Sequence, residues 1–267
     1  MTPEPLDIRA FNRTAWDRQV ETGNPWTIPV TSEQIQAARR GEWTVVLTAS
    51  KAVPRSWFPP DLHGVDLLGL ASGGGQQMPI LAAAGARVTL LDNSPRQLER
   101  DRVLAEREGL SIRLLEGDMR DLSALADASF DLVFHPVSNL FIPDPTPVWR
   151  EAFRVLRPGG CLLAGFCNPD TYLFDPLVQD NENRLEVRFK LPYSDLEALG
   201  VEEHIRRLGP EAPLEWSHSM DSLVGAQLDA GFVLAGFYED RDPEGILSAY
   251  MPHYYATRAV KPPFQRN

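Results

Sequence analysis

Residues 69–77 read Gly69-Leu70-Ala71-Ser72-Gly73-Gly74-Gly75-Gln76-Gln77, and this glycine-rich stretch decides the fold that the sequence predicts. It follows an apolar run at 65–70 and precedes a helix-like apolar segment at 78–84. Glycine lets the backbone turn tightly and approach a ligand with no side chain between them, and the N-terminus of a following helix offers free N–H groups. The stretch therefore predicts a strand, a tight turn and a helix. A tight connection alone would also explain the glycines, without any ligand.

Further short apolar runs follow this turn. They lie at 86–91, 112–115, 130–134 and 161–166. Near-continuous apolar runs of this length suit strands that are buried on both faces of a sheet. Helix signals separate the runs. Five strands joined by helical crossovers predict a doubly wound parallel sheet of the α/β class.

Two of the intervening helices have recognisable ends. Ser94 followed by Pro95 and Gln97 is typical of an N-cap, a first-turn proline and a capping-box partner. The pair at 146–147 repeats the cap-then-proline signal, and Pro-Gly-Gly at 158–160 is expected to end that second helix.

The flanking segments complete one predicted domain over residues 1–267. Residues 1–62 are expected to form an N-terminal helical cap, with helices at about 5–21 and 31–40, packed on the ligand edge of a core at 63–168. Residues 169–217 read as a substrate-side insertion after strand five, with an exposed strand at 185–191. Residues 218–267 add a helix at about 220–230 and strands at 232–238 and 254–260. The predicted sheet is therefore mainly parallel and seven-stranded.

Composition restricts the partners. Among 267 residues, 37 are Asp or Glu and 26 are Lys or Arg, a formal net charge of -11. This balance disfavours a nucleic-acid-binding protein, which grips phosphates through a basic face, and favours a small-molecule or protein partner. No run of 18 apolar residues predicts a membrane span, and the first ten residues lack a signal-peptide pattern, so a cytoplasmic location is expected.

The chain has two cysteines, Cys161 and Cys167. On one extended strand they would lie about 20 Å apart, too far for a disulfide. We expect them to be small buried apolar side chains, and we predict no metal site.

Three residues with ligand chemistry stand at successive strand ends. Asp92 ends the second predicted strand, where a carboxylate can accept hydrogen bonds from the hydroxyls of a ribose or can instead cap the helix that starts near Ser94. Asp118 and Met119 end the third, where a carboxylate can accept from an adenine amino group and a thioether can lie on the ring, although Asp118 alone reads as a turn residue. Carboxyl ends of parallel strands share one edge of a sheet, so together these residues predict an adenosine site.

Five motifs occur in order over about 100 residues. They are ASGGG at 71–75, GARVTLLDNS at 85–94, EGDM at 116–119, FDLV at 130–133 and FRVLRPGG at 153–160. On these motifs the segment from about 64 to 168 resembles class I S-adenosylmethionine-dependent methyltransferases, which have a Rossmann-like fold. With 73–77 and 135–139 added, the whole chain resembles a bacterial subgroup of these enzymes.

The resemblance implies S-adenosylmethionine as the cofactor. It implies that Gly73 and Gly75 border the methionine part, that Asp92 holds the ribose and that Asp118 with Met119 holds the adenine. The same predicted cofactor site includes Gly69, Ala71, Asn93 and His135.

The sequence departs from the family at one point. The usual pattern is acid-x-Gly-x-Gly-x-Gly, and here Gly69 stands at the acidic position and Ala71 at the first glycine. In the family the acid helps to orient the cofactor's ammonium group. A backbone carbonyl, Ser72 or the N-terminal cap is expected to replace that contact.

Methyl transfer to a hydroxyl or an acidic C–H needs a base. In the family, the position after strand four faces the methyl group, and here it carries His135-Pro136-Val137-Ser138-Asn139 rather than the Asn/Asp-Pro-Pro-aromatic motif of adenine and amide N-methylating enzymes. His135 is the candidate catalytic base because neutral imidazole titrates near working pH; the alternative is that it satisfies backbone carbonyls.

Substrate contacts are expected from Trp57, Asn139 and Tyr172. Trp57 and Tyr172 belong to a larger set of aromatic residues that could line a pocket or fill the core between cap and sheet. The other members are Trp16, Trp26, Phe174 and Tyr193.

The predicted function is methyl transfer from S-adenosylmethionine to a small-molecule O, N or C nucleophile. One alternative is a non-catalytic adenosyl-ligand sensor or protein-interaction module with the same fold, suggested by the missing acid at Gly69 and by the lack of a certain catalytic base. A nicotinamide-dependent oxidoreductase is a further alternative, but it would need Gly-x-Gly-x-x-Gly after the first strand.

Overall fold

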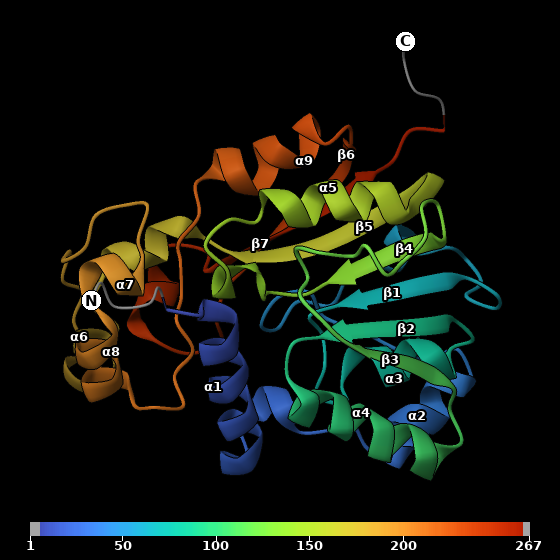
Figure 1. The fold of residues 1–267 in the computed structure, drawn as a ribbon, viewed down its shortest axis with the longest axis horizontal. Helices are drawn as coiled ribbons and strands as arrows, with labels where there is room; N and C mark the ends of the chain where they lie inside the picture. Colours follow the sequence, from blue (N-terminus) through green and yellow to red (C-terminus); the bar gives the residue numbers. More distant parts are fainter. Residues whose placement is uncertain (1–5, 264–267) are drawn as a thin grey trace.

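A computed structural model describes residues 6–263 of the chain, and its centre is a seven-stranded sheet with the strand order β3-β2-β1-β4-β5-β7-β6 (Figure 1). The strands are β1 (Asp66–Leu70), β2 (Arg87–Asp92), β3 (Ile112–Glu116), β4 (Phe130–His135), β5 (Leu156–Cys167), β6 (Val233–Asp240) and β7 (Tyr254–Val260). Neighbouring strands from β1 to β5 are parallel, whereas β7 runs antiparallel to both β5 and β6. The sheet is therefore mixed, with one antiparallel strand near its edge.

Helices cover both faces of the sheet (Figure 1). They are α1 (Ile8–Thr22), α2 (Ser32–Arg39), α3 (Gln77–Ala83), α4 (Pro95–Glu108), α5 (Thr146–Val155), α6 (Pro176–Glu182), α7 (Asp195–Ala198), α8 (Val201–Leu208) and α9 (Ala226–Asp229). A π-helical turn, η5 (Asp221–Gly225), leads into α9, and short 3₁₀ turns are η1 (Pro25–Thr27), η2 (Arg55–Trp57), η3 (Asn139–Phe141), η4 (Pro169–Leu173) and η6 (Ile246–Ala249). Helices α5 and α9 lie on one face, and α3 and α4 lie on the other.

Two apolar clusters form the core because successive strand side chains point to opposite faces. Leu67 packs in the cluster that contains Met78 and Leu81 of α3, whereas its neighbour Leu68 packs in the cluster that contains Trp149 of α5. All five of these side chains are completely buried. Burial on both faces explains why β1 reads as a near-continuous apolar run.

Helix α1 stands beyond the carboxyl ends of the parallel strands, between them and the α6–α8 segment (Figure 1). Asn12 fixes it there. The Asn12 Nδ2 group donates to the carbonyl oxygens of Phe141 (2.8 Å) and Leu214 (3.0 Å), and Oδ1 accepts from the Leu214 N–H (2.7 Å). The buried Asn12 side chain thus joins the N-terminal segment, the loop after β4 and the segment after β5 at one edge of the sheet.

Several sequence expectations need correction. The strand expected at 185–191 is absent: only an isolated bridge joins Val187 to Phe174, because the Arg188 and Phe189 N–H groups both donate to the Leu173 carbonyl instead of to a partner strand. The expected capping box of α4 forms only in part, since Ser94 accepts from the Gln97 N–H without the reciprocal bond.

Helix α5 and the N-terminal helices also differ from expectation. Helix α5 ends at Val155, earlier than predicted, because Leu156 pairs with Phe130 and already belongs to β5. Its first residue is Thr146, which is therefore not the cap. The helix expected at about 5–21 begins at Ile8, and residue 5 lies outside the described residues. Helix α2 contacts α3, so only α1 of the two reaches the ligand edge.

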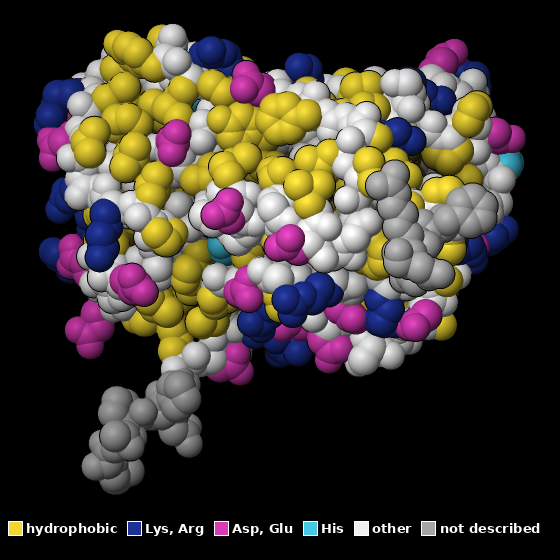
Figure 2. All heavy atoms as spheres, turned by 90° about the horizontal axis from the view of Figure 1, so that it is seen from above, with side chains coloured by type: hydrophobic (Ala, Val, Ile, Leu, Met, Phe, Trp, Pro, Cys, Tyr) yellow, Lys and Arg dark blue, Asp and Glu magenta, His cyan; other side chains and the backbone are white. Residues whose placement is uncertain are grey.

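The surface carries apolar side chains over α9 and β6 (Figure 2). Leu228, Val233 and Phe237 are the large exposed ones on these two elements. Between residues 6 and 263, no helix combines the length and the apolar composition that crossing a bilayer requires.

Asp240, at the end of β6, holds the loop at 48–51 against the sheet. Its Oδ2 accepts from the Thr48 hydroxyl (2.7 Å) and from the Ser50 and Lys51 N–H groups (both 2.9 Å), and Oδ1 accepts from the Ser50 hydroxyl (2.9 Å). Burial alone would raise the pKa of Asp240, but the backbone and hydroxyl donors outweigh it and hold the pKa below its ordinary value.

We expect Asp240→Asn to lower the free energy of unfolding by about 1.5–3 kcal/mol at pH 7, because an amide N–H₂ would face donors that now bind a carboxylate. A carboxyl with a lowered folded pKa stabilises above its unfolded pKa, near 4, and loses that contribution as pH falls further. The difference in free energy of unfolding between D240N and wild type should therefore become smaller at acidic pH. Urea unfolding at several pH values measures it, with the exposed Asp229→Asn as the matched control. Equal stability of D240N and wild type at pH 7 would contradict this account.

Candidate functional site

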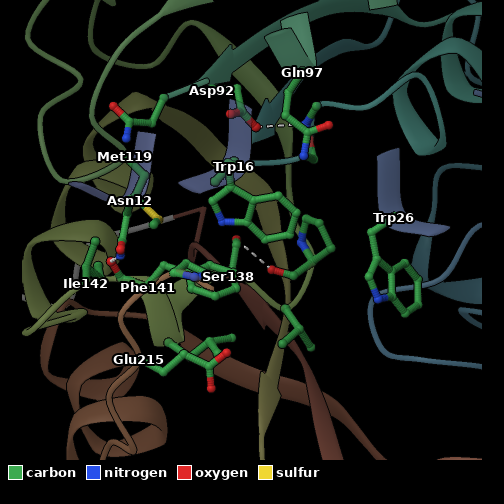
Figure 3. Close-up of a pocket in the computed structure, with 18 of the residues that line it drawn as sticks. Asn12, Trp16, Trp26, Asp92, Gln97, Met119, Ser138, Phe141, Ile142 and Glu215 are labelled. Carbon is green, nitrogen blue, oxygen red and sulfur yellow. Dashed lines mark hydrogen bonds between the residues drawn. The ribbon is translucent and has the colours of Figure 1, made fainter. Parts of the chain in front are cut away.

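A cavity of about 460 Å³ opens at the carboxyl ends of the parallel strands (Figure 3), within the usual range for ligand pockets. Helix α1, the turn after β1, the ends of β2 and β3, the loop after β4 and the segment after β5 all contribute to its wall. Residues that line it include Arg9, Asn12, Trp16, Trp26, Thr48, Ala71, Ser72, Gly73, Asp92, Asn93, Gln97, Asp118, Met119, Arg120, Ser138, Phe141, Tyr172 and Glu215.

Two aspartate side chains hold the glycine turn. Asp92 Oδ2 accepts from the Gly73 N–H (2.9 Å), and Asp101 Oδ2, from α4, accepts from the N–H groups of Gly74 (2.9 Å) and Gly75 (3.0 Å). A Cβ at Gly73 would lie 2.8 Å from Gln97 Cβ and 3.0 Å from Asp92 Oδ2, so only glycine fits between the turn and α4.

Asp92 reaches the cavity from the end of β2. Its Oδ1 also accepts from the Ser94 N–H at 2.9 Å, so the carboxylate both caps the start of α4 and faces the cavity. Burial raises the pKa of Asp92, and the Ser94, Gly73 and Asn93 N–H groups oppose that shift. Each carboxylate oxygen keeps a second lone pair for a ligand hydroxyl.

The end of β3 places Asp118 and Met119 in the same wall. Asp118 forms an ion pair with Arg120 (Oδ2 to Nη2, 2.6 Å), and Arg120 keeps the pKa of that carboxyl below its usual value despite burial. Asn93 also lines the cavity, and its side chain exchanges hydrogen bonds with Arg9 of α1. Helix α1 therefore contacts the strand ends directly.

Two buried acceptors beside the turn lack partners. Ser72 and Gln97 line the cavity, while their Oγ and Oε1 atoms are enclosed and make no hydrogen bond with any of the residues 6–263. Buried polar atoms are nearly always hydrogen-bonded, so a turn of either side chain toward the cavity would bring its unpaired oxygen to a ligand donor.

The predicted residues of the turn divide into two groups. Ala71, with φ of +49°, and Gly73 line the cavity, whereas Gly69 and Gly75 do not. Pro29 covers Gly75, since a Cβ there would lie 2.9 Å from Pro29 Cβ.

Gly69 is covered by Met78. A Cβ at Gly69 would collide with Met78 Sδ and would lie 2.7 Å from Ser72 Oγ. The completely buried Met78 therefore occupies the space that an acidic side chain at this position would need.

His135 lies outside the cavity wall, which does not support its predicted role as a base. The imidazole is completely buried, its Nδ1 donates to the Leu70 carbonyl (2.9 Å), and its ring packs edge-on to Trp149. Burial lowers the pKa of His135 to about 4. A neutral imidazole that bonds a backbone carbonyl matches the structural alternative for this residue.

Two of the three predicted substrate residues also lie elsewhere. Asn139 is buried and donates to the Gly165 carbonyl (2.8 Å), and Trp57 packs in the core against Tyr238. Tyr172 does line the cavity, and its hydroxyl donates to Glu215 Oε2 (2.8 Å).

Sequence reasoning missed several lining residues. Trp16, considered only as one of many aromatics, lies in the middle of the cavity view, and Glu215 was not singled out (Figure 3). Spacing on α1 offers one signal, because Asn12, Trp16 and Gln19 follow a helical period and all line the cavity. No local pattern marks Glu215.

The buried carboxyl group of Asp101 predicts how the free energy of unfolding depends on pH. Burial raises the pKa of Asp101 to about 8, against the effect of the Gly75 and Gly74 N–H groups. Between about pH 4 and 8 the folded protein then keeps a proton that the unfolded chain has lost, so the free energy of unfolding should fall as pH rises. Asp101→Asn, a neutral isostere, should flatten this dependence. Urea unfolding at pH 5, 6.5 and 8 measures both proteins, with Asp229→Asn as control; identical slopes for wild type and D101N would refute the assignment.

Comparison with known proteins agrees with this geometry. A family model described as a methyltransferase domain matches residues 68–164. The uncharacterized methyltransferase YbaJ of Bacillus subtilis (strain 168) is 47% identical over 252 residues, which cover 94% of this chain and 98% of that protein. A sterol 24-C-methyltransferase of Aspergillus fumigatus is 33% identical over 136 residues, 50% of this chain and 35% of that protein.

A solved structure supports the fold. The crystal structure of an S-adenosylmethionine-dependent methyltransferase from Mesorhizobium loti matches with a TM-score of 0.59 at 18% identity, over 77% of this chain and 94% of that chain. The cofactor of this family is S-adenosylmethionine. The near full-length match to the Bacillus subtilis protein, together with the methyltransferase domain, shows that the chain belongs to the class I S-adenosylmethionine-dependent methyltransferases.

Proposed function

We propose that this methyltransferase transfers the methyl group of S-adenosylmethionine to an O, N or C nucleophile of a small molecule. The observation that carries the proposal is that one cavity contains both the strand-end residues suited to adenosine and apolar side chains, among them Trp16 of α1 and Leu140, Phe141 and Ile142 after β4. Bound there, the cofactor supplies an electrophilic methyl group on a sulfonium. The protein's task is to hold the nucleophile in line with that methyl and to exclude water.

The cavity residues fit the cofactor. Asp92 would accept from the ribose hydroxyls, and Met119 would lie against the adenine. Ser72 Oγ and Gln97 Oε1, the acceptors without protein partners among residues 6–263, are suited to donors of the ligand such as its ammonium group. They would take the place of the acid that is missing at Gly69. Asp118 already pairs with Arg120, so we assign it a weaker part in adenine binding.

The position of α1 supports a small acceptor. Asn12 ties α1 to the Phe141 and Leu214 backbones, so the helix walls one side of the cavity and leaves a pocket rather than a groove for a polymer. A net charge of -11 also disfavours nucleic acid. The sterol methyltransferase among the relatives acts on a small apolar acceptor, consistent with a pocket lined by Leu140 and Ile142.

We expect S-adenosylmethionine and S-adenosylhomocysteine each to raise the melting temperature, because a ligand that binds only the folded state stabilises it. NAD should not, since the turn lacks the dinucleotide glycine spacing. A thermal-shift assay with the three ligands measures this. Stabilisation by NAD alone would contradict the assignment of the cavity.

Asp92→Ala should weaken S-adenosylhomocysteine binding by about 1–3 kcal/mol, the scale for losing hydrogen bonds to a charged group. Calorimetric titration of the folded variant measures the affinity, and Asp229→Asn, an exposed carboxylate on α9, serves as the control. An affinity of D92A equal to wild type would remove Asp92 from the cofactor site.

A further inference from the structure

The cavity contains a carboxyl group on the side away from the adenosine residues. Glu215 lies below the Ser138 and Phe141 side chains in Figure 3, with Asp92 on the opposite side of the Trp16 ring. It belongs to the segment between α8 and η5, which contributes Pro213 and Glu215 to the wall.

Neighbouring groups hold Glu215 in place. Its N–H donates to Asp195 Oδ2 (2.7 Å), and Tyr172 donates its hydroxyl to Glu215 Oε2 (2.8 Å). Tyr172 itself stacks on Tyr193 with ring centroids 5.4 Å apart, and the Tyr193 hydroxyl donates to Asp195 Oδ1 (2.7 Å). A hydrogen-bonded network therefore holds the Glu215 carboxyl in position, whereas the carboxyl of a flexible surface residue would be free to move.

One oxygen of this carboxyl remains available. Oε2 accepts from Tyr172, and no hydrogen bond to Oε1 occurs among residues 6–263. Glu215 is only partly buried because this end of the side chain borders the cavity. A group in the cavity could therefore donate a proton to Oε1.

The surroundings suit a proton acceptor. Burial raises the pKa of Glu215 to about 7, with Asp195 adding to the rise while Tyr172 and His204 oppose it. Cys167 and Tyr254 face the same group, and burial raises the pKa of each well above its ordinary value, so both stay neutral. A base with a pKa near the working pH is efficient in proton transfer.

The other candidate bases in the cavity are already engaged. Asp92 accepts from backbone N–H groups at both oxygens, and Asp118 pairs with Arg120. His135 is outside the wall. Among the described residues that line the cavity, Glu215 is thus the carboxylate that has one oxygen, Oε1, without a protein hydrogen bond.

Resting on the proposed function, we propose that Glu215 is the catalytic residue that takes the proton from the acceptor's O–H or N–H group, and that Tyr172 positions its carboxylate. The substrate is then a small, mainly apolar molecule with a hydroxyl or amine as its nucleophile. In the step, the O or N forms a bond to the methyl carbon, the carbon–sulfur bond breaks with its electron pair going to sulfur, and the proton passes to Glu215 Oε1. A neutral thioether, the methylated product and a protonated Glu215 result.

The first test needs no substrate. Wild-type protein labelled with ¹³C at the Glu side-chain carboxyls is titrated by NMR, and comparison with Glu215→Gln assigns the Glu215 signal. We expect a midpoint near pH 7 in wild type. A midpoint near 4, the ordinary value for Glu, would overturn the role of Glu215 as a proton acceptor.

The second test measures methyl transfer. The wild type, E215Q and the control Glu197→Gln, an exposed residue of α7, are incubated with methyl-labelled cofactor. The acceptors are a bacterial small-molecule extract and a panel of alkylphenols, naphthols and anilines. We expect E215Q to lose at least about 100-fold in rate at pH 7. Its affinity for S-adenosylhomocysteine should stay within about twofold of wild type, which also shows that it is folded.

Tyr172→Phe tests the positioning role. Removing the hydroxyl removes a hydrogen bond that favours the charged carboxylate, so the pKa of Glu215 should rise and the acidic limb of the kcat/KM profile should move to higher pH. If Tyr172→Phe lowers kcat/KM at every pH without shifting the profile along the pH axis, Tyr172 contributes only packing and does not position the carboxylate.

The outcomes separate the two proposals. If E215Q methylates as fast as wild type, the role of Glu215 is wrong and the proposed function stands. If wild type binds S-adenosylhomocysteine but labels nothing in the extract or the panel, methylation of small molecules is itself contradicted, and the proposed role of Glu215 falls with it.

Discussion

The glycine turn after β1 depends on two aspartate side chains, one at the end of β2 and one on α4. Asp92 and Asp101 accept from three consecutive N–H groups of the turn, so the backbone at 73–75 is fixed by β2 and α4 rather than by its own sequence. The N-terminal segment adds to this, because the Val30 N–H donates to the Gly75 carbonyl (2.9 Å). The shape of the ligand edge is therefore set by long-range hydrogen bonds, and a buried, high-pKa Asp101 is part of that arrangement.

The missing acid at Gly69 has a structural counterpart. In this chain the Met78 thioether fills the space beside Gly69, and a larger side chain there would collide with it. The turn keeps its form without the acid, while Ser72 and Gln97 bring buried acceptors to the same region. Met78 thus fills the space beside Gly69, and the departure from the family pattern leaves no void. This weakens one of the two sequence features that favoured a non-catalytic protein.

Much of the fold could be predicted because it follows from periodicity and from the signals at element ends. Apolar runs such as 65–70 identified strands that are buried on both faces of the sheet. Because these strands are parallel, Asp92 and Met119 lie at the same edge of the sheet for any conformation of the connecting loops. The direction of a side chain could not be predicted from the sequence. His135 is at the end of β4 as expected, but its ring packs against Trp149 and its Nδ1 donates to the Leu70 carbonyl, so the imidazole points away from the cavity. Glu215 has no local pattern, and only contacts such as that between Asn12 and Leu214 bring its segment to the strand ends.

The central claim is that this cavity holds the cofactor, with the ribose at Asp92 and the acceptor substrate on the side of Glu215 and Tyr172. A crystal structure of the protein with S-adenosylhomocysteine tests it most directly. The account predicts ribose hydroxyls within hydrogen-bond distance of the Asp92 carboxylate, the adenine against Met119, and the sulfur directed toward the part of the cavity that contains Glu215. A ligand bound outside this cavity, or one whose ribose lies away from Asp92, would contradict it.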